Sequence, residues 1–197
     1  MKKILLAGVS AGMMSCALLG SAVAATFDFG GTITYHNDVL EFQFTLFDEA
    51  TGVRVWTDSF NDYENFDPIT AVWGSATGEL FGQNDDNPSV NPGTQSYFDS
   101  GLVFATLPAG VYTVTVAVYD NFAAGSNLGQ GFPWDGAVAR TLVDFYGEDV
   151  GGYCHIVFDG VDAASGPGDP VPEPATMILF GAGLAGLAAT RRRKYGS

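Results

Sequence analysis

The sequence predicts an all-β protein, an antiparallel β-sandwich of jelly-roll type, flanked by an N-terminal signal peptide and a single C-terminal transmembrane helix. Three observations predict this fold class. Apolar and polar residues alternate strictly in residues 40–46 and again in 112–118, as is typical of half-buried strands. No long apolar repeat of 3.6 residues occurs between the two ends of the chain. About nine short strands in a domain of this length argue for a sandwich.

The expected strands are separated by short turn sequences. Residues 50–52, 76–78 and 108–110 each end in glycine and predict turns. The folded domain is expected to span residues 25–163, followed by a Gly- and Pro-rich linker at 164–171. The predicted strands are 27–35, 40–46, 53–57, 69–73, 79–82, 97–105, 112–118, 138–145 and 153–161.

Residues 1–24 predict a secretory signal peptide. Lys2 and Lys3 precede a nearly uninterrupted apolar run at 4–19. Ala22 and Ala24 are the small residues that signal peptidase requires, so cleavage is expected before Ala25. Cys16 raises the alternative of a lipidated cysteine. The residues before it are a poor lead-in for lipidation, and the apolar run continues past it.

The C-terminal segment predicts a membrane helix at 175–190, which carries no charge. As a helix it would span about 24 Å, a minimal crossing of a hydrocarbon core of about 30 Å. The cluster Arg191, Arg192, Arg193 and Lys194 follows directly and is expected to hold the C-terminus in the cytoplasm. The same segment contains GAGLAG at 181–186, yet no acidic residue follows it. A dinucleotide site is therefore excluded, because that site needs a βαβ unit and a later carboxylate.

The last 26 residues resemble a known sorting signal. Val171, Pro172, Glu173 and Pro174 precede the apolar segment and the basic cluster. This order, over residues 172–197, resembles the PEP-CTERM family. The resemblance implies recognition by an exosortase, a membrane-embedded cysteine transpeptidase, in a bacterium that makes exopolysaccharide. The alternative is an ordinary C-terminal anchor that is never processed.

The charge distribution excludes some partners. The 21 acidic residues between positions 28 and 169 stand against two basic ones, Arg54 and Arg140, a formal charge of −19. Such a surface repels nucleic acid and anionic lipid. Cys154 is the one cysteine after the signal peptide, so no internal disulfide is expected. We expect Cys154 to be buried, with pairing between two chains as the alternative.

A second resemblance lies inside the folded domain. The elements Asp67-Pro68, Asn84-Asp85-Asp86 and Asp99-Ser100-Gly101, together with the run 107–112, follow one another at short intervals. This order, over residues 36–120, resembles the bacterial pre-peptidase C-terminal β-sandwich domain. In that family, the Asn-Asp-Asp loop and a later aspartate can hold calcium. Residues 121–162 depart from the pattern.

Two binding sites are predicted from residue type. Calcium prefers six to eight oxygen ligands, and Asn84, Asp85 and Asp86 supply oxygens, with Asp67 or Asp99 approaching from neighbouring strands. A solvated turn is the alternative, because Asn and Asp are common in turns. Trp134 lies in a loop rich in glycine and proline and is a candidate platform for stacking a sugar. The alternative is that it covers an edge of the core.

No enzymatic activity is expected. Cys154 and His155 are neighbours in a predicted strand, so their side chains point to opposite faces. The chain has no G-x-S-x-G nucleophile elbow. Paired carboxylates for glycoside cleavage stay open among so many acidic residues.

The expected protein is a non-catalytic binding or structural module of the cell surface or exopolysaccharide matrix. The alternative is a calcium-dependent carbohydrate-binding module. The precursor is expected to be anchored in the inner membrane, with its folded domain in the periplasm.

Overall fold

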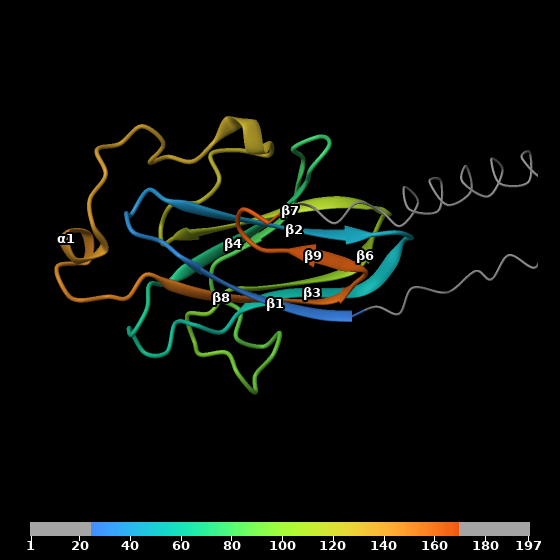
Figure 1. Cartoon of the computed structure of the whole chain (residues 1–197), viewed down its shortest axis with the longest axis horizontal. Coiled ribbons are helices and arrows are strands. Elements are labelled where there is room, and N and C mark those ends of the chain that lie inside the picture. The colour runs from blue at the N-terminus through green and yellow to red at the C-terminus, as the bar shows by residue number, and fades with distance from the viewer. Residues whose placement is uncertain (1–24, 170–197) are drawn as a thin grey trace, which may run out of the picture.

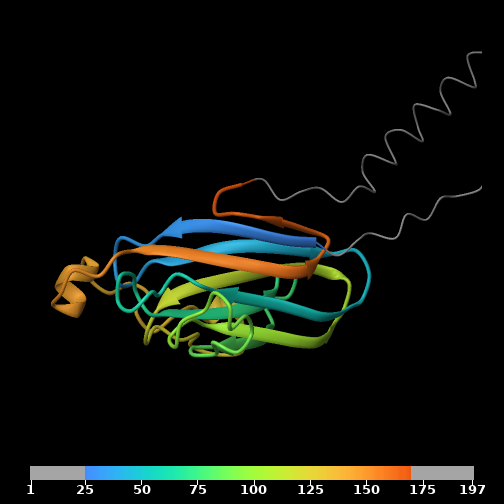
Figure 2. The ribbon, with the colours of Figure 1, turned by 90° about the horizontal axis from the view of Figure 1, so that it is seen from below.

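The computed structural model describes residues 25–169. In this part of the chain, two antiparallel sheets pack face to face (Figures 1 and 2). The first sheet has the order β1 (Ala25–Thr32), β8 (Tyr153–Val161), β3 (Ala50–Thr57) and β6 (Gly101–Leu107). The second has the order β5 (Leu80–Asn84), β4 (Pro68–Gly74), β7 (Gly110–Val118), β2 (Val39–Leu46) and β9 (Ala163–Ser165). The prediction of an all-β sandwich is therefore confirmed.

The connections between the strands follow the order of a jelly roll. Apart from the β4–β5 hairpin, each connection from β1 to β8 crosses from one sheet to the other. Every paired strand is antiparallel. Two four-stranded sheets linked in this way make the double Greek key of a jelly roll. The short strand β9 adds a fifth member to the second sheet by pairing with β2.

Aromatic side chains from both sheets form the centre of the core. Phe42 and Phe44 of β2 meet Phe158 of β8, with ring centroids 6.2 and 5.9 Å apart. All three side chains are at most 1% exposed. Burial of each such side chain contributes about 1.5–3 kcal/mol, so these rings hold the two layers together.

Strand β7 differs from the half-buried strand that its alternating pattern predicts. Val114 and Val116 point into the core, and Thr113 and Thr115 on the opposite face are also buried. On this opposite face, the indole nitrogen of Trp73 donates a hydrogen bond to the Thr115 hydroxyl at 2.9 Å. The Thr115 hydroxyl thus accepts a hydrogen bond from a buried side chain. The sequence pattern alone does not distinguish such a threonine from one that faces solvent.

The predicted strand at 138–145 is wrong. The segment contains instead a short helix, α1 (Leu142–Tyr146). The Thr141 hydroxyl accepts a hydrogen bond from the Asp144 N–H at 3.2 Å and caps the helix N-terminus. Gly147 ends the helix with a φ of 78°, a left-handed conformation that suits glycine. A helix of five residues is too short to show a 3.6-residue period.

Two predicted boundaries are also corrected. Strand β6 begins at Gly101, so residues 97–100 belong to the loop before it. The predicted linker at 164–171 overlaps β9, in which Ala164 pairs with Phe44 and Ser165 pairs with Gln43. Small residues suit a linker and an edge strand equally well, so composition does not separate the two.

The long connections gather at one end of the sandwich, which we call the loop end. It carries the β3–β4 loop (58–67), the β5–β6 loop (85–100) and the β7–β8 connection (119–152), which includes η1 (Leu128–Gln130) and α1. Figure 1 shows α1 at this end, opposite the start of β1. The strand pairs Thr70–Asn84 and Pro68–Val118 align the three loops beside one another. The polar side chains of these loops, including Asp67, Asp85 and Asp86, therefore lie together at the loop end.

The predicted targeting segments lie outside the described residues. These are the signal peptide at 1–24 and the segment from 170 onward, which includes the predicted membrane helix at 175–190. Among residues 25–169, no helix has the length and apolar character needed to cross a membrane.

Candidate functional site

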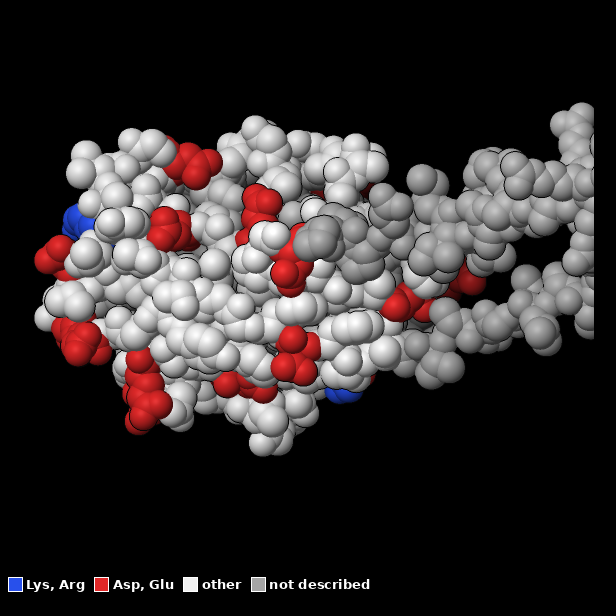
Figure 3. Space-filling model, viewed as in Figure 1, with Lys and Arg blue, Asp and Glu red and all other residues white. Residues whose placement is uncertain are grey.

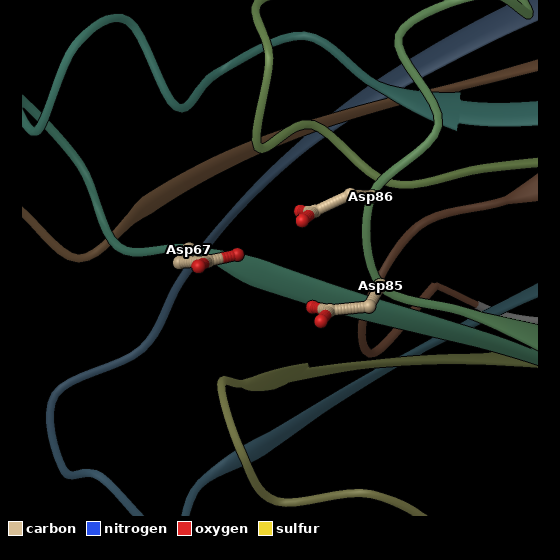
Figure 4. A group of neighbouring side chains, drawn as sticks. All are labelled: Asp67, Asp85 and Asp86. Atoms are coloured by element: carbon tan, nitrogen blue, oxygen red, sulfur yellow. The ribbon is translucent and has the colours of Figure 1, made fainter.

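Three aspartates converge at the loop end. Asp67 directly precedes β4, and Asp85 and Asp86 directly follow β5. One carboxylate oxygen of each lies within 4.8 Å of the others. Figure 4 shows the three carboxylates pointing toward a shared space. These are three of the five calcium ligands that the sequence predicts.

Strand pairing explains why these residues meet. Pro68 begins β4 and favours an extended conformation at Asp67. The Asp67 carbonyl accepts a hydrogen bond from the Tyr119 N–H at 2.9 Å, which fixes the residue against the end of β7. On the other side, Thr70 pairs with Asn84, so the chain after β5 runs alongside the chain before β4.

The electrostatics of the group are unfavourable in the absence of a cation. Burial raises the pKa of Asp67 to about 7, with further increases from the negative charges of Asp85, Asp86 and Asp99. Burial also raises the pKa of Asp85 to about 6, helped by Asp86 and Asp120. The pKa of Asp86 is raised by burial as well. Carboxylates with raised pKa values are groups that a bound cation would stabilise in their charged form.

The chemistry of the three aspartates fits a calcium ion. Atom Oδ1 of Asp67 and Oδ1 of Asp85 are buried and accept no hydrogen bond among the described residues. Calcium binds carboxylate oxygens in a flexible arrangement, and it would satisfy both atoms. The set of ligands would have to be completed by further oxygens, since calcium prefers six to eight.

Neither arginine of the described chain neutralises the aspartates by an ion pair. Arg54 binds Asp159 at 2.7 Å and lies over the ring of Trp56. Arg140 lies over the ring of Phe145 at 4.9 Å. Figure 3 shows the result on one face, where acidic groups are spread over the surface and basic groups are few. Among the described residues, no arginine therefore forms an ion pair with Asp67, Asp85 or Asp86.

Asp99 and Asn84 have other roles, which corrects the predicted ligand set. Asp99 is 0% exposed and accepts five hydrogen bonds. Its donors are Thr57 Oγ1, Ser59 N, Phe60 N, Ser96 N and Ser96 Oγ. The side-chain oxygen of Asn84 accepts a hydrogen bond from Gly101 N at 2.9 Å. Both residues organise the loops around the aspartates.

Asp120 is a neighbour of the cluster that the sequence pattern did not indicate. Its charge contributes to the raised pKa of Asp85. Asp120 follows β7, and the pairing of Val118 with Pro68 brings it to the same edge as Asp67. The sequence predicts β7 from its alternating residues, but it does not show that β7 pairs with β4, the strand that Asp67 precedes.

Trp134 covers an edge of the core, which was the alternative to a stacking platform. It is partly buried against the main core cluster. Its ring contacts His36 and Phe145, with centroids 5.2 and 5.1 Å away. His36 is itself 4% exposed. Trp134 is therefore held by packing on His36 and Phe145, and stacking of a sugar on its exposed part stays a prediction.

Cys154 and His155 point to opposite faces of β8, as predicted. Cys154 is a free cysteine with 0% exposure, and burial raises the pKa of its thiol to about 12. A thiol in this state is neither charged nor accessible, so it is inert. His155 lies on the other face, where Nδ1 is 2.5 Å from Asp58 and Nε2 is 3.5 Å from Asp28. Cys154 and His155 therefore do not form a nucleophile–base pair.

The comparison with protein families concerns the C-terminal segment. Residues 170–194 match the model of the PEP-CTERM protein-sorting motif. The motif indicates an exported protein that an exosortase sorts, with a precursor that passes the membrane. A search among curated proteins finds no match. The resemblance of residues 36–120 to the pre-peptidase C-terminal domain stays a prediction.

The raised pKa values predict that stability falls as pH rises when calcium is absent. The folded carboxyls of Asp67 and Asp85 have pKa values of about 7 and 6, above the ordinary value of 3.8. Between these limits the folded state binds more protons than the unfolded state, so each step up in pH favours unfolding. We expect a loss of about 1–2 kcal/mol between pH 5 and pH 8, after allowance for solvent screening.

Chemical denaturation of the full chain in chelator measures this dependence. The pKa of His155 is also raised, so its contribution falls in the same direction. The variant Asp67→Asn isolates the contribution of Asp67, because it removes that carboxyl and keeps Asp85 and His155. A pH dependence that is equal in wild type and variant would contradict the assignment to Asp67.

Proposed function

We propose that the protein is an exported surface module that an exosortase processes and that binds calcium at its loop end. The match at residues 170–194 supports the sorting. The cluster of Asp67, Asp85 and Asp86 supports the calcium site, because its oxygens converge and two of them are buried without a hydrogen-bond partner among the described residues. The mature domain acts as a non-catalytic binding or structural module at the cell surface or in the exopolysaccharide matrix.

Calcium would join two loops that like charges otherwise push apart. Asp67 belongs to the β3–β4 loop, and Asp85 and Asp86 belong to the β5–β6 loop. A cation between them removes the repulsion that raises their pKa values and fixes the loops relative to one another. Outside the cell, where calcium reaches the site freely, such a clamp stabilises a domain whose single cysteine is buried and free.

A calcium titration of the full chain tests this function. In calorimetry, we expect calcium to bind at one site and magnesium to bind more weakly, because magnesium demands a stricter octahedral geometry. At a calcium concentration of about a hundred times the Kd, unfolding should cost about 2.7 kcal/mol more. That increase corresponds to a rise in Tm of about 5–10 °C for a domain of this size.

A pair of matched variants provides the control. The double change Asp85→Asn with Asp86→Asn should abolish calcium binding and the rise in Tm. The change Asp48→Asn with Glu49→Gln removes two adjacent charges from an exposed turn at the other end of the sandwich. It should leave both effects intact. An equal response of the two variants would show that calcium acts through general charge screening.

A further inference from the structure

We propose that a polar pocket at the loop end binds a neutral oligosaccharide, with Tyr63 and Tyr97 as stacking surfaces. The pocket has a volume of about 290 Å³, near the lower end for ligand sites. The β3–β4 loop, the β5–β6 loop and the start of β8 form it. Its principal polar side chains are Asp58, Asn61, Glu64, Asn65, Thr94 and Ser96. None of the residues that line it belongs to the aspartate cluster.

The lining groups suit the hydroxyls of a sugar. Carboxylate, amide and hydroxyl groups together offer both donors and acceptors, and no lysine or arginine lines the pocket. Asp58 uses Oδ1 for His155 at 2.5 Å, which leaves Oδ2 for a ligand. An anionic ligand is disfavoured by these carboxylates and by the charge of −19 over residues 25–169.

Two exposed tyrosines are close in the chain to residues that line the pocket. Tyr63 lies between the lining residues Asn61 and Glu64, and Tyr97 follows the lining residue Ser96. Their exposed fractions are 49% and 50%, which is high for such large side chains. A tyrosine combines an apolar face, which stacks on the C–H face of a sugar ring, with a hydroxyl that hydrogen-bonds.

A buried ring holds both tyrosines in place. Phe60 is 0% exposed and contacts Tyr63 and Tyr97 edge to face, with centroids 5.0 and 5.4 Å away. The Tyr97 hydroxyl donates a hydrogen bond to Asp62 at 3.1 Å, which ties the two loops together. Because the rings are fixed before binding, little side-chain entropy is lost when a ligand stacks on them.

The backbone around the pocket is also fixed in an uncommon conformation. Asn61, Asp62 and Tyr63 have φ values of 44°, 54° and 68°, and a bulky residue such as tyrosine is rare in that region. Gly151 N donates to the Glu64 carbonyl at 2.9 Å and holds this turn. A Cβ on Gly151 would lie 2.5 Å from the same carbonyl, so only glycine permits the contact. Strained turns that the fold holds in this way are common at binding sites.

The test measures binding of defined neutral tetrasaccharides to the full chain. The chain is kept in a zwitterionic detergent without a sugar headgroup, because a maltoside would compete. The probes are cellotetraose, laminaritetraose, maltotetraose and chitotetraose, followed by calorimetry and tyrosine fluorescence. We expect at least one to bind with a Kd below about 1 mM, the range of modest ligand affinities. No binding of any probe at concentrations up to about ten times that Kd, with calcium and without it, would overturn the proposal.

Three variants locate the site. Tyr97→Ala should weaken binding about 3- to 10-fold through the lost stacking, and Tyr97→Phe should retain it because the ring remains. Tyr35→Ala is the matched control, since Tyr35 is 41% exposed and, unlike Tyr97, is not next to a lining residue in the chain. Equal melting temperatures show that the variants are folded. Equal binding by Tyr97→Ala and Tyr35→Ala would overturn the assignment.

Two further outcomes distinguish this pocket from a sugar site at the aspartates and from a site for cations. Sugar binding should persist in chelator and in the variant Asp85→Asn with Asp86→Asn. Loss under both conditions would move the site to the aspartates and overturn this assignment, while calcium binding itself would stand. Glu64→Gln should change sugar binding by less than about 3-fold, because an amide also accepts hydrogen bonds. A lysine-rich peptide that binds instead, and that Glu64→Gln weakens, would overturn the proposal in favour of a cation site.

Discussion

Replacing Pro172, Glu173 and Pro174 with alanine is expected to leave the protein as an uncut precursor in the membrane fraction. The change keeps the apolar segment at 175–190 and the basic cluster after it, so membrane insertion should be unaffected. It removes the residues that distinguish a PEP-CTERM signal from an ordinary anchor. Processing should therefore fall to a background level while export continues.

Cell fractionation and immunoblotting measure this effect in the protein's own host. The matched control replaces Tyr195, Gly196 and Ser197, which lie beyond the matched segment 170–194. The control should be processed like the wild type. Normal processing of the Pro172–Glu173–Pro174 variant would refute recognition through this motif and would favour a plain C-terminal anchor.

Asp99→Ala is expected to cause a large loss of stability at the loop end. The variant leaves Thr57, Ser59, Phe60 and Ser96 without the carboxylate to which they donate five hydrogen bonds. A buried donor without a partner costs about 1–3 kcal/mol, and several donors share this acceptor. We expect a decrease of about 3–5 kcal/mol in the free energy of unfolding.

Chemical denaturation followed by tryptophan fluorescence measures this decrease, because Trp56 and Trp73 are buried. Asp48→Ala removes an aspartate from an exposed turn and should change stability by less than about 0.5 kcal/mol. Asp99→Asn should fall between the two, since it keeps one of the two oxygens. A loss below about 1 kcal/mol for Asp99→Ala would show that water replaces the carboxylate.

The sequence predicted the sheets better than the loops. In strands such as β2 and β7, apolar and polar residues alternate strictly over seven residues, because successive side chains point to opposite faces of the sheet. The helix α1 was missed because its five residues cover little more than one turn. Its N-cap Thr141 and its terminal Gly147 were the signals that could have indicated it.

The aspartate cluster was predicted in part for a related reason. Asp85 and Asp86 are adjacent in the chain, and a turn after a strand was foreseeable. Asp67 and Asp120 join them only through the pairing of β4 with β5 and β7. Asp99 was predicted as a ligand from its residue type. In the structure it is buried, and both of its carboxylate oxygens accept hydrogen bonds from backbone and hydroxyl donors of the neighbouring loops. Strand pairing and burial are long-range properties that a single sequence does not reveal.

The pocket was not predicted because its parts have no common pattern. Asn61 and Ser96 lie 35 residues apart and meet through a hydrogen bond of 3.3 Å. Trp134 lies in a loop that its glycines and proline indicate, and in the structure its ring packs against His36. The exposed tyrosines beside Phe60 are less conspicuous in the sequence, and only the fold brings them together.

The intact mass of the protein recovered from its own host, with peptide mapping of both ends, shows whether the C-terminal signal is processed. We expect a mature chain that begins at Ala25 and ends near Pro172–Pro174, without the apolar segment and the cluster Arg191–Lys194. A recovered chain that still ends at Ser197 would contradict processing through the C-terminal signal.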